Sequence, residues 1–212
     1  MTATARHSAA LAPRLGAARQ VRLPSATWAT AIAVAAVLLG LDLLLRPTPV
    51  PPLTVHLAQL ALAGAAAFLL DDAAVGLTGV APPPLWLRRA ARIAAGLAVL
   101  TTAWLVILFA VPDGSRGALT LEVSVLIVLA LAAGSVAAAR DQSEPGTTVA
   151  SGVVLAGVGA MLTGMVLGRA VFVSDAEPPG RDILVVVWAA LGVVSGVVLL
   201  VASRDPAARH WR

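Results

Sequence analysis

Six long apolar segments alternate with short polar stretches along the chain. Each segment has about 18 to 21 residues, the length that an α-helix needs to cross a hydrocarbon core of about 30 Å. The runs are continuously apolar instead of alternating, which disfavours a transmembrane β-barrel. The pattern predicts an all-α fold, a polytopic membrane bundle of about six transmembrane helices. The predicted spans are residues 26–45, 53–70, 93–111, 119–139, 149–167 and 183–201.

Proline and arginine positions indicate the boundaries and the orientation of these spans. No proline lies inside a predicted span, so each span is expected to be an unbroken helix. All fifteen basic residues are arginine. If the N-terminus is cytoplasmic, eleven of these arginines fall on the cytoplasmic side and four on the outer side. Positively charged residues are enriched in cytoplasmic loops, so we predict that both termini are cytoplasmic.

This topology divides the chain into three parts. Residues 1–25 are predicted to be a basic cytoplasmic segment, residues 26–201 a six-helix transmembrane domain, and residues 202–212 a basic cytoplasmic tail. A long basic region precedes the first apolar run, and no cleavage site is followed by a soluble domain, so we expect an uncleaved first helix. The chain is therefore predicted to be a multi-pass protein of the cell (plasma) membrane.

The composition agrees with a membrane location and excludes several function classes. Hydrophobic residues make up 59% of the chain and charged residues 12%, against about half and about a quarter in soluble domains. The absence of cysteine excludes disulfides, thiolate metal sites and cysteine catalysis. The isoelectric point near 11.4 does not indicate nucleic acid, because no basic stripe carries interleaved aromatic residues. Arginine and alanine richness without lysine is typical of a high-GC genome and suggests an actinobacterial source.

A few polar side chains fall within the spans, all toward their predicted outer ends. Ionisable groups in lipid are costly, so each is a functional hypothesis. Asp42 and His56 are the strongest pair, because a short loop makes their helices neighbours. The functional interpretation is an outward-facing polar vestibule that meets a substrate head group or an ion, and the alternative is ordinary interfacial charge, solvated or locally paired. The candidate cluster comprises Asp42, His56, Gln59, Glu122 and Arg169.

The deeper parts of the spans argue against other chemistry. No carboxylate or arginine lies near the centre of a span, which disfavours a proton-driven carrier. An intramembrane serine protease needs a histidine at depth, whereas His56 is near a boundary and the other histidines lie in the tails. The sequence has no Walker A motif, so this chain is not expected to bind ATP. We predict no enzyme activity, no catalytic residue, no metal site and no cofactor in this chain.

Small residues recur every four positions in the fifth predicted helix. Such spacing lets helix backbones approach closely in lipid. The sixth helix has two glycines in the same relation, so we predict a tight pairing of the fifth and sixth helices, with a contact to another subunit as the alternative. The predicted packing residues are Gly152, Ala156, Ala160, Gly164 and Gly168, with Gly192 and Gly196.

The layout resembles a known family of membrane proteins. Six spans, cytoplasmic ends and a basic cytoplasmic loop between the second and third helices resemble the membrane subunit of an ABC exporter of the type-two permease kind. Four short stretches also resemble uncharacterised actinobacterial membrane proteins encoded beside ABC ATPases. They are Leu70-Asp71-Asp72-Ala73-Ala74, Pro82-Pro83-Pro84-Leu85-Trp86-Leu87-Arg88-Arg89, Glu144-Pro145-Gly146 and Ser203-Arg204-Asp205-Pro206.

The resemblance implies a coupling segment within 71–92 that docks on a separate ATPase and a contact of residues 8–22 with anionic lipid. The predicted function is a membrane subunit of a multi-component export system, with ATP bound by a partner. Its partners would be membrane lipid, an ABC ATPase and a second membrane subunit or a second copy, without nucleic acid. The short loop 168–182 and the small size depart from the family, so a non-transporting scaffold or accessory subunit is the alternative. The predicted coupling residues are Asp71, Asp72, Arg88, Arg89 and Arg92.

Overall fold

The computed structural model describes residues 24–45, 52–70, 85–140, 145–177 and 179–202. These residues form helices and connecting turns without any strand, so the predicted all-α fold is confirmed for the described part of the chain. A 3₁₀ turn, η1 (Phe68–Leu70), continues the second helix. The helices are α2 (Pro24–Leu45), α3 (Pro52–Ala67), α4 (Leu85–Phe109), α5 (Asp113–Ala138), α6 (Pro145–Leu167) and α7 (Gly180–Ala202).

Prolines open the helices and do not interrupt them. Pro24, Pro52 and Pro145 are the first residues of α2, α3 and α6. Proline suits this position because its missing N–H would have no partner within the helix and its fixed φ angle is already helical. Pro112 in turn caps the start of α5. The expectation of unbroken helices is therefore confirmed in the described residues.

Four helical segments are long and apolar enough to cross a membrane, which indicates a membrane protein. They are Pro52–Leu70, Asp113–Ala138, Pro145–Leu167 and Gly180–Ala202. In α2 and α4 the apolar stretches found among the described residues are shorter, namely Ile32–Asp42 and Ile93–Phe109.

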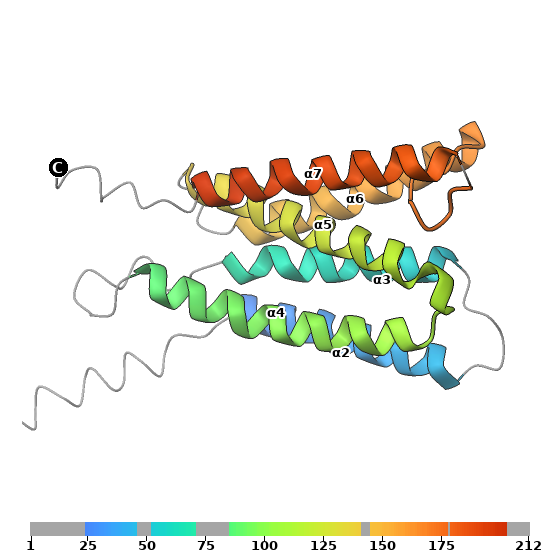
Figure 1. Cartoon of the computed structure of the whole chain (residues 1–212). Coiled ribbons are helices and arrows are strands. Elements are labelled where there is room, and N and C mark those ends of the chain that lie inside the picture. The colour runs from blue at the N-terminus through green and yellow to red at the C-terminus, as the bar shows by residue number, and fades with distance from the viewer. Residues whose placement is uncertain (1–23, 46–51, 71–84, 141–144, 178, 203–212) are drawn as a thin grey trace, which may run out of the picture.

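Helix α3 lies at the centre of the bundle and α6 and α7 lie at its edge (Figure 1). In the most apolar window of α3 and η1, 61% of the residues are buried, against 11% in each of α6 and α7. Helix α3 contacts α2, α5 and α6, while α7 packs mainly on α5. The end of α2, the start of α3, the α4–α5 turn and the α6–α7 connection all lie at one end of the bundle (Figure 1). We call this the loop end.

Leucines of α3 and η1 fit against glycines of three neighbouring helices. A Cβ atom built on Gly157 of α6 would overlap the side chain of Leu60, and one on Gly96 of α4 would overlap Leu69. On α5, a Cβ built on Gly134 would lie 2.8 Å from Leu70 Cδ1. The bundle therefore places large side chains of its central helix where neighbouring helices have none, a packing that suits close helix association.

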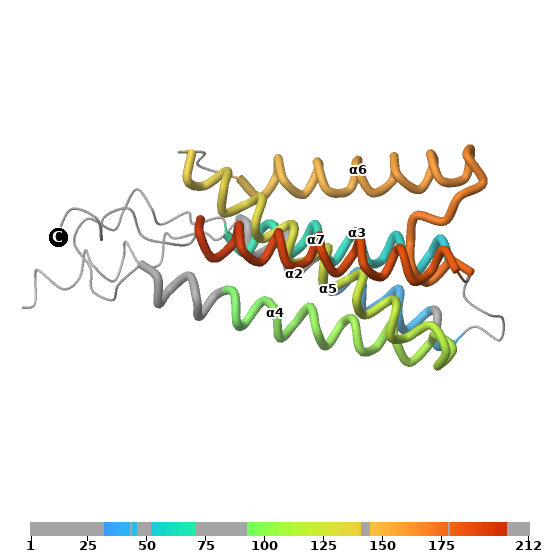
Figure 2. Tube along the Cα trace, turned by 45° about the horizontal axis from the view of Figure 1, so that its top comes forward, coloured from blue at the N-terminus to red at the C-terminus, as the bar shows by residue number. Residues whose placement is uncertain are grey.

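The predicted tight pairing of the fifth and sixth helices is wrong. Helix α6 packs on α3 and α5, with few contacts to α7, and Figure 2 shows α6 set apart from α7. The reason is helical geometry: residues four apart differ by about 40° around the helix axis, so five of them turn through about 160° and cannot face one straight neighbour. Gly152 and Ala156 are exposed, whereas Gly164 is buried.

On α7 the two predicted packing glycines differ as well. A Cβ atom built on Gly192 would lie 3.0 Å from Val125 Cγ2 of α5, so Gly192 does permit a close helix contact, but with α5. A Cβ on Gly196 would meet no atom within 4 Å. Helix α7 therefore packs on α5 through Gly192.

Candidate functional site

The connection from α6 to α7 folds back onto the bundle because two glycines permit the turn. Gly168 has a positive φ angle of 61°, a conformation that glycine adopts without strain. Its N–H donates to the carbonyl of Met165 at 3.4 Å, and the N–H of Arg169 donates to the carbonyl of Gly164 at 2.9 Å. This is the Schellman arrangement that ends many helices. Gly168, predicted to be a packing residue, ends α6.

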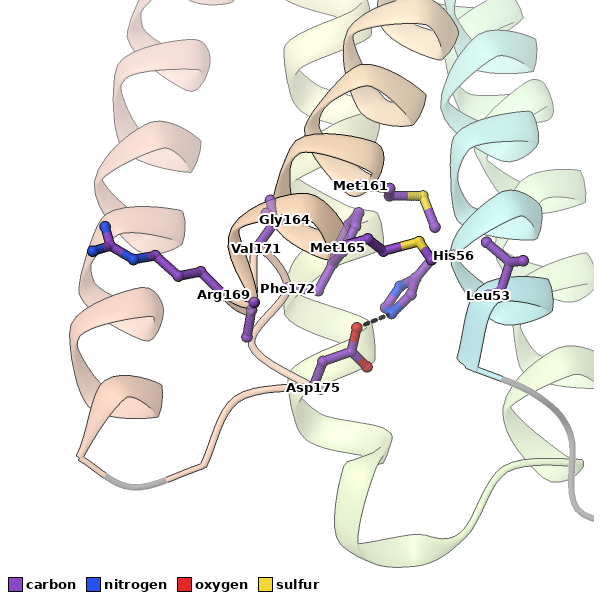
Figure 3. A pocket seen from close by; sticks show the side chains of 11 residues that line it. Leu53, His56, Met161, Gly164, Met165, Arg169, Val171, Phe172 and Asp175 are labelled. Atoms are coloured by element: carbon purple, nitrogen blue, oxygen red, sulfur yellow. Dashed lines mark hydrogen bonds and ion pairs between the residues drawn. The ribbon is translucent and has the colours of Figure 1, made fainter.

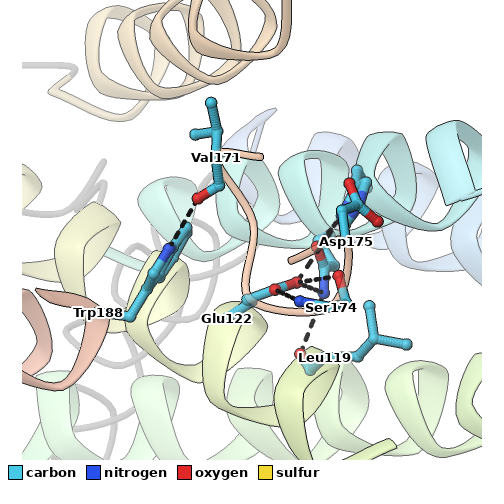
Figure 4. A network of polar contacts seen from close by, with 8 residues as sticks. Leu119, Glu122, Val171, Ser174, Asp175 and Trp188 are labelled. Atoms are coloured by element: carbon cyan, nitrogen blue, oxygen red, sulfur yellow. Dashed lines mark hydrogen bonds and ion pairs between the residues drawn. The ribbon is translucent and has the colours of Figure 1, made fainter. Parts of the chain in front are cut away.

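Gly164 provides the space into which the chain returns. A Cβ atom at this position would lie 2.8 Å from the carbonyl oxygen of Arg169 and 2.8 Å from Val171 Cγ2. Residues 169–177, which we call the return loop, can therefore lie against the end of α6. Phe172 and Val173 of the return loop are buried, and Trp188 of α7 donates a hydrogen bond from Nε1 to the Val171 carbonyl at 3.1 Å (Figure 4).

The return loop covers a buried polar network at the loop end of the bundle. Glu122 of α5 is fully buried, and it accepts hydrogen bonds from two elements. Its Oε1 accepts from the backbone N–H of Ser174 at 2.8 Å, and its Oε2 accepts from Gln59 Nε2 at 3.1 Å and from Ser174 Oγ at 3.4 Å (Figure 4). Both oxygens of Glu122 are therefore occupied as acceptors by N–H donors of two other segments.

Gln59 links Glu122 to His56, which lies three residues earlier on α3. The amide nitrogen of Gln59 also donates to the carbonyl of Leu119 at 3.0 Å, which fixes the orientation of the amide because a carbonyl only accepts. The amide oxygen of Gln59 therefore accepts from His56 Nδ1, which lies 3.0 Å away. It follows that His56 carries a proton on Nδ1.

The other nitrogen of His56 shares a single proton with Asp175 of the return loop. His56 Nε2 lies 2.9 Å from Asp175 Oδ2. Because Nδ1 is protonated, the proton of this bond is held by Nε2 as an imidazolium or by Asp175 as a carboxylic acid. The imidazole ring is 2% exposed and stacks on Phe172 with a centroid distance of 4.0 Å and an interplanar angle of 16°.

The His56–Asp175 pair with its one shared proton is neutral overall in both cases. An imidazolium with a carboxylate and a neutral imidazole with a carboxylic acid give the same sum. In the described part of the chain, no arginine bonds to these groups. The Arg116 guanidinium pairs with Asp113, and Figure 3 shows the Arg169 side chain directed away from His56 and Asp175.

Two cavities share the His56–Asp175 pair. The larger, about 380 Å³, lies between α3, α6 and the return loop, and its lining includes Leu53, Met161 and Met165 (Figure 3). The smaller, about 200 Å³, lies on the side of the α4–α5 turn. The described residues contain no group of three His, Asp or Glu side chains suited to a metal ion. The arrangement can hold one proton between two groups and present a carboxylate to two cavities.

The structure brings together three of the five residues of the predicted polar cluster. His56, Gln59 and Glu122 form one network, and they are buried and bonded within the protein. Asp42 has an exposed side chain on α2, and both ring nitrogens of His56 bond to other residues. Asp42 is therefore not bonded to His56, although their helices α2 and α3 are neighbours as predicted. Arg169 is exposed at the start of the return loop.

Sequence reasoning missed Ser174 and Asp175. Residues 168–182 were expected to be a short connecting loop. The available signal was the apolar run from Val171 to Val173 directly before these polar residues, which indicates a loop that packs on the bundle. The predicted coupling residues Asp71 and Asp72 lie outside the described residues, as do the side chains of Arg88, Arg89 and Arg92, so this prediction stays untested.

Comparisons of the chain with protein-family models, with curated proteins and with solved structures give no match. The resemblance to ABC exporter subunits therefore stays a prediction from the layout and short motifs of the sequence.

Proposed function

We propose that this chain is a six-span, non-catalytic membrane subunit that binds a transmembrane helix of a partner chain. Within this proposal, the leading role is a membrane subunit of a multi-component export system of the ABC type that works with a separate ATPase. The observation that carries the proposal is a straight strip of small residues on the exposed face of α6.

The strip comprises Gly152, Ala156, Gly159 and Thr163, all of which are exposed. Positions separated by four, three and four residues fall within about 60° of one another around a helix, so the strip runs along the helix and does not wind around it. A Cβ atom on either glycine would meet no atom within 4 Å, which leaves the backbone of α6 open to a close approach.

Large apolar side chains lie along one side of the strip. Leu155 is 72% exposed and Leu162 is 58% exposed. A row of small residues beside large apolar side chains is a surface that a second transmembrane helix packs on, because small residues permit close backbone contact in lipid. A transmembrane helix of a second membrane chain is therefore the occupant that we propose.

Helix lengths and arginine positions support six spans with cytoplasmic termini. Helix α2 has 22 residues and α4 has 25, so at about 1.5 Å per residue each is long enough for a core of about 30 Å. The arginine distribution supports the cytoplasmic placement of both termini and a location in the plasma membrane.

The export role rests on the basic cytoplasmic segment 71–92 that the sequence predicts. The alternative, a scaffold or accessory subunit of another membrane complex, is supported by the same strip on α6, because it requires a partner helix and no ATPase.

Co-purification in a mild detergent tests the partner-binding surface. The double substitution Gly152→Leu with Gly159→Leu fills the strip and is expected to remove a co-purifying membrane chain. Ser151→Leu is the matched control, because it adds a comparable side chain at another exposed position of the same helix. Retention of the partner by the double variant, in a chain that is still monodisperse, would contradict the proposed surface.

A second experiment separates the two roles. Changing Arg88, Arg89 and Arg92 to Glu is expected to remove a co-purifying ATPase while the membrane partner stays bound. Arg140, Arg209 and Arg212 changed to Glu form the control, since they are predicted to lie on the same side of the membrane. An associated membrane chain without any ATPase would favour the accessory role.

A further inference from the structure

The larger cavity at the loop end is lined by residues that take no part in the proposed partner binding. Its volume is about 380 Å³, within the range of small-molecule sites. Two groups of different character meet in it: the His56–Asp175 pair on one side and the side chains of Leu53, Met161 and Met165 on the other (Figure 3).

The polar side of the cavity offers a carboxyl oxygen that has no donor in the described part of the chain. Arg169 also lines the cavity, but its side chain is directed away from His56 and Asp175 (Figure 3). Asp175 Oδ2 bonds to His56, whereas Asp175 Oδ1 accepts no hydrogen bond from the residues that the structure describes. Asp175 is 36% exposed, so this oxygen is accessible to a ligand. A cation that carries hydrogen-bond donors would supply the missing partner of this oxygen.

The apolar side of the cavity is suited to a chain of methylene groups. Methionine side chains are flexible and polarisable and adapt to ligands of different shape. Met165 is 75% exposed and Leu53 is 53% exposed, so the cavity opens onto the apolar surface of the bundle. An alkyl chain that leaves the cavity therefore meets the apolar surface beside Leu53 and Met165.

We infer that this cavity binds an amphiphilic cation, an ammonium group on an alkyl chain, with the ammonium at Asp175 and the first methylene groups beside Met161 and Met165. The same chemistry can come from a free alkylamine or from a lipid with an ethanolamine head group. This ligand site is separate from the partner-binding strip and does not depend on it.

Equilibrium dialysis of the purified full-length chain in nonionic maltoside micelles tests the inference, with tritiated decylammonium as the probe. Saturable binding of one molecule per chain is expected. Each added methylene that enters the cavity should tighten the Kd about fourfold. Decyl sulfate, with the same chain and the opposite charge, should not compete.

Two matched pairs of variants separate the charge from the cavity. Asp175→Asn is expected to weaken binding at least tenfold, whereas Asp182→Asn removes the same charge from the start of α7 and should leave binding unchanged. Met161→Trp fills the cavity and should also weaken binding at least tenfold, whereas Leu162→Trp alters an exposed neighbour and should have no effect. If Asp175→Asn is not monodisperse, the tryptophan pair decides the outcome.

Competition by short-chain lipids identifies the source of the ammonium group. Competition by phosphatidylethanolamine, without competition by phosphatidylglycerol, supports the inference with a lipid as ligand. No competition by either lipid supports it with a free amine as ligand. Three results would overturn the inference. They are equal competition by both lipids, equal effects of the two variants within either pair, and sodium binding at Asp175 together with no effect of Met161→Trp on amine binding.

Discussion

Glu122→Gln is the substitution that should open the return loop, because an amide cannot replace this carboxylate. Oε1 of Glu122 accepts from the backbone N–H of Ser174 and Oε2 accepts from Gln59 Nε2. Both partners are donors. In either orientation, the amide that replaces the carboxylate therefore places its own NH₂ group against one of them. Gln59 cannot rotate to compensate, because its nitrogen is also held by the carbonyl of Leu119.

The magnitude follows from the bonds affected. Of the two bonds from N–H donors, one is lost in either orientation of the amide, whereas the Ser174 hydroxyl can rotate to accept from the new NH₂ group. A buried donor left without a partner costs about 1 to 3 kcal/mol, and because Glu122 is fully buried we expect the upper end, about 3 kcal/mol. An opening equilibrium shifted by this amount changes by about 100-fold. The helices of the bundle should remain folded, because α3 and α5 also pack through apolar side chains of the core, such as Val55 and Leu119.

The absence of native cysteine permits a direct assay. Val173 is 1% exposed, so Val173→Cys introduces a single thiol that reacts with a maleimide only when the return loop opens. When opening and closing are fast relative to the reaction, the labelling rate reports the population of the open loop. Glu122→Gln in this background should speed labelling about 100-fold.

Glu177→Gln supplies the control, because it removes the same charge from an exposed position of the same loop. It should leave the labelling rate within about twofold, as expected for an exposed substitution. If Glu122→Gln labels no faster than this control, the buried carboxylate does not hold the return loop and the proposed network is refuted.

Three further substitutions or labels test other parts of the structure. Gly168→Ala places a side chain at a φ angle of 61° and should lower the free energy of unfolding by about 1 kcal/mol in detergent denaturation. The control is Gly180→Ala, which has open space and no positive φ, and an equal loss there would argue against a role of the turn. Gly157→Ala places a methyl group against Leu60 and should lower the free energy of unfolding by about 1 to 3 kcal/mol, whereas Gly152→Ala, with no atom within 4 Å, should be neutral or stabilising. The reverse order would contradict the packing of α6 on α3. A cysteine at exposed position Gly114 should react with an impermeant reagent outside intact cells and one at Ala139 should not; labelling of Ala139 from outside would contradict the predicted orientation.

The return loop gives Glu122, His56 and Gln59 a different environment from the one that their places in the sequence suggest. Each lies toward the loop end of its helix, where a polar residue would ordinarily be solvated. Phe172 and Val173 cover this region, so the polar groups bond to one another and to the backbone. The expected vestibule is therefore a closed network with two cavities beside it.

The sequence by itself determined the helical character of the chain and most helix positions. Continuous apolar runs of membrane-spanning length can satisfy their backbone hydrogen bonds in lipid only as helices or closed barrels, and prolines such as Pro52 and Pro145 mark helix starts for a local reason. The grouping of His56 with Gln59 could also be predicted, because residues three apart share one face of a helix.

Only the tertiary structure decided which residues complete the site and which face of α6 packs. His56 and Asp175 are 119 positions apart, and no local periodicity encodes a contact between a helix and a loop at that separation. The stripe of small residues on α6 was misread for a related reason. A spacing of four residues describes a spiral on the helix, and the surrounding helices decide that Gly157 faces Leu60 while Gly152 stays exposed.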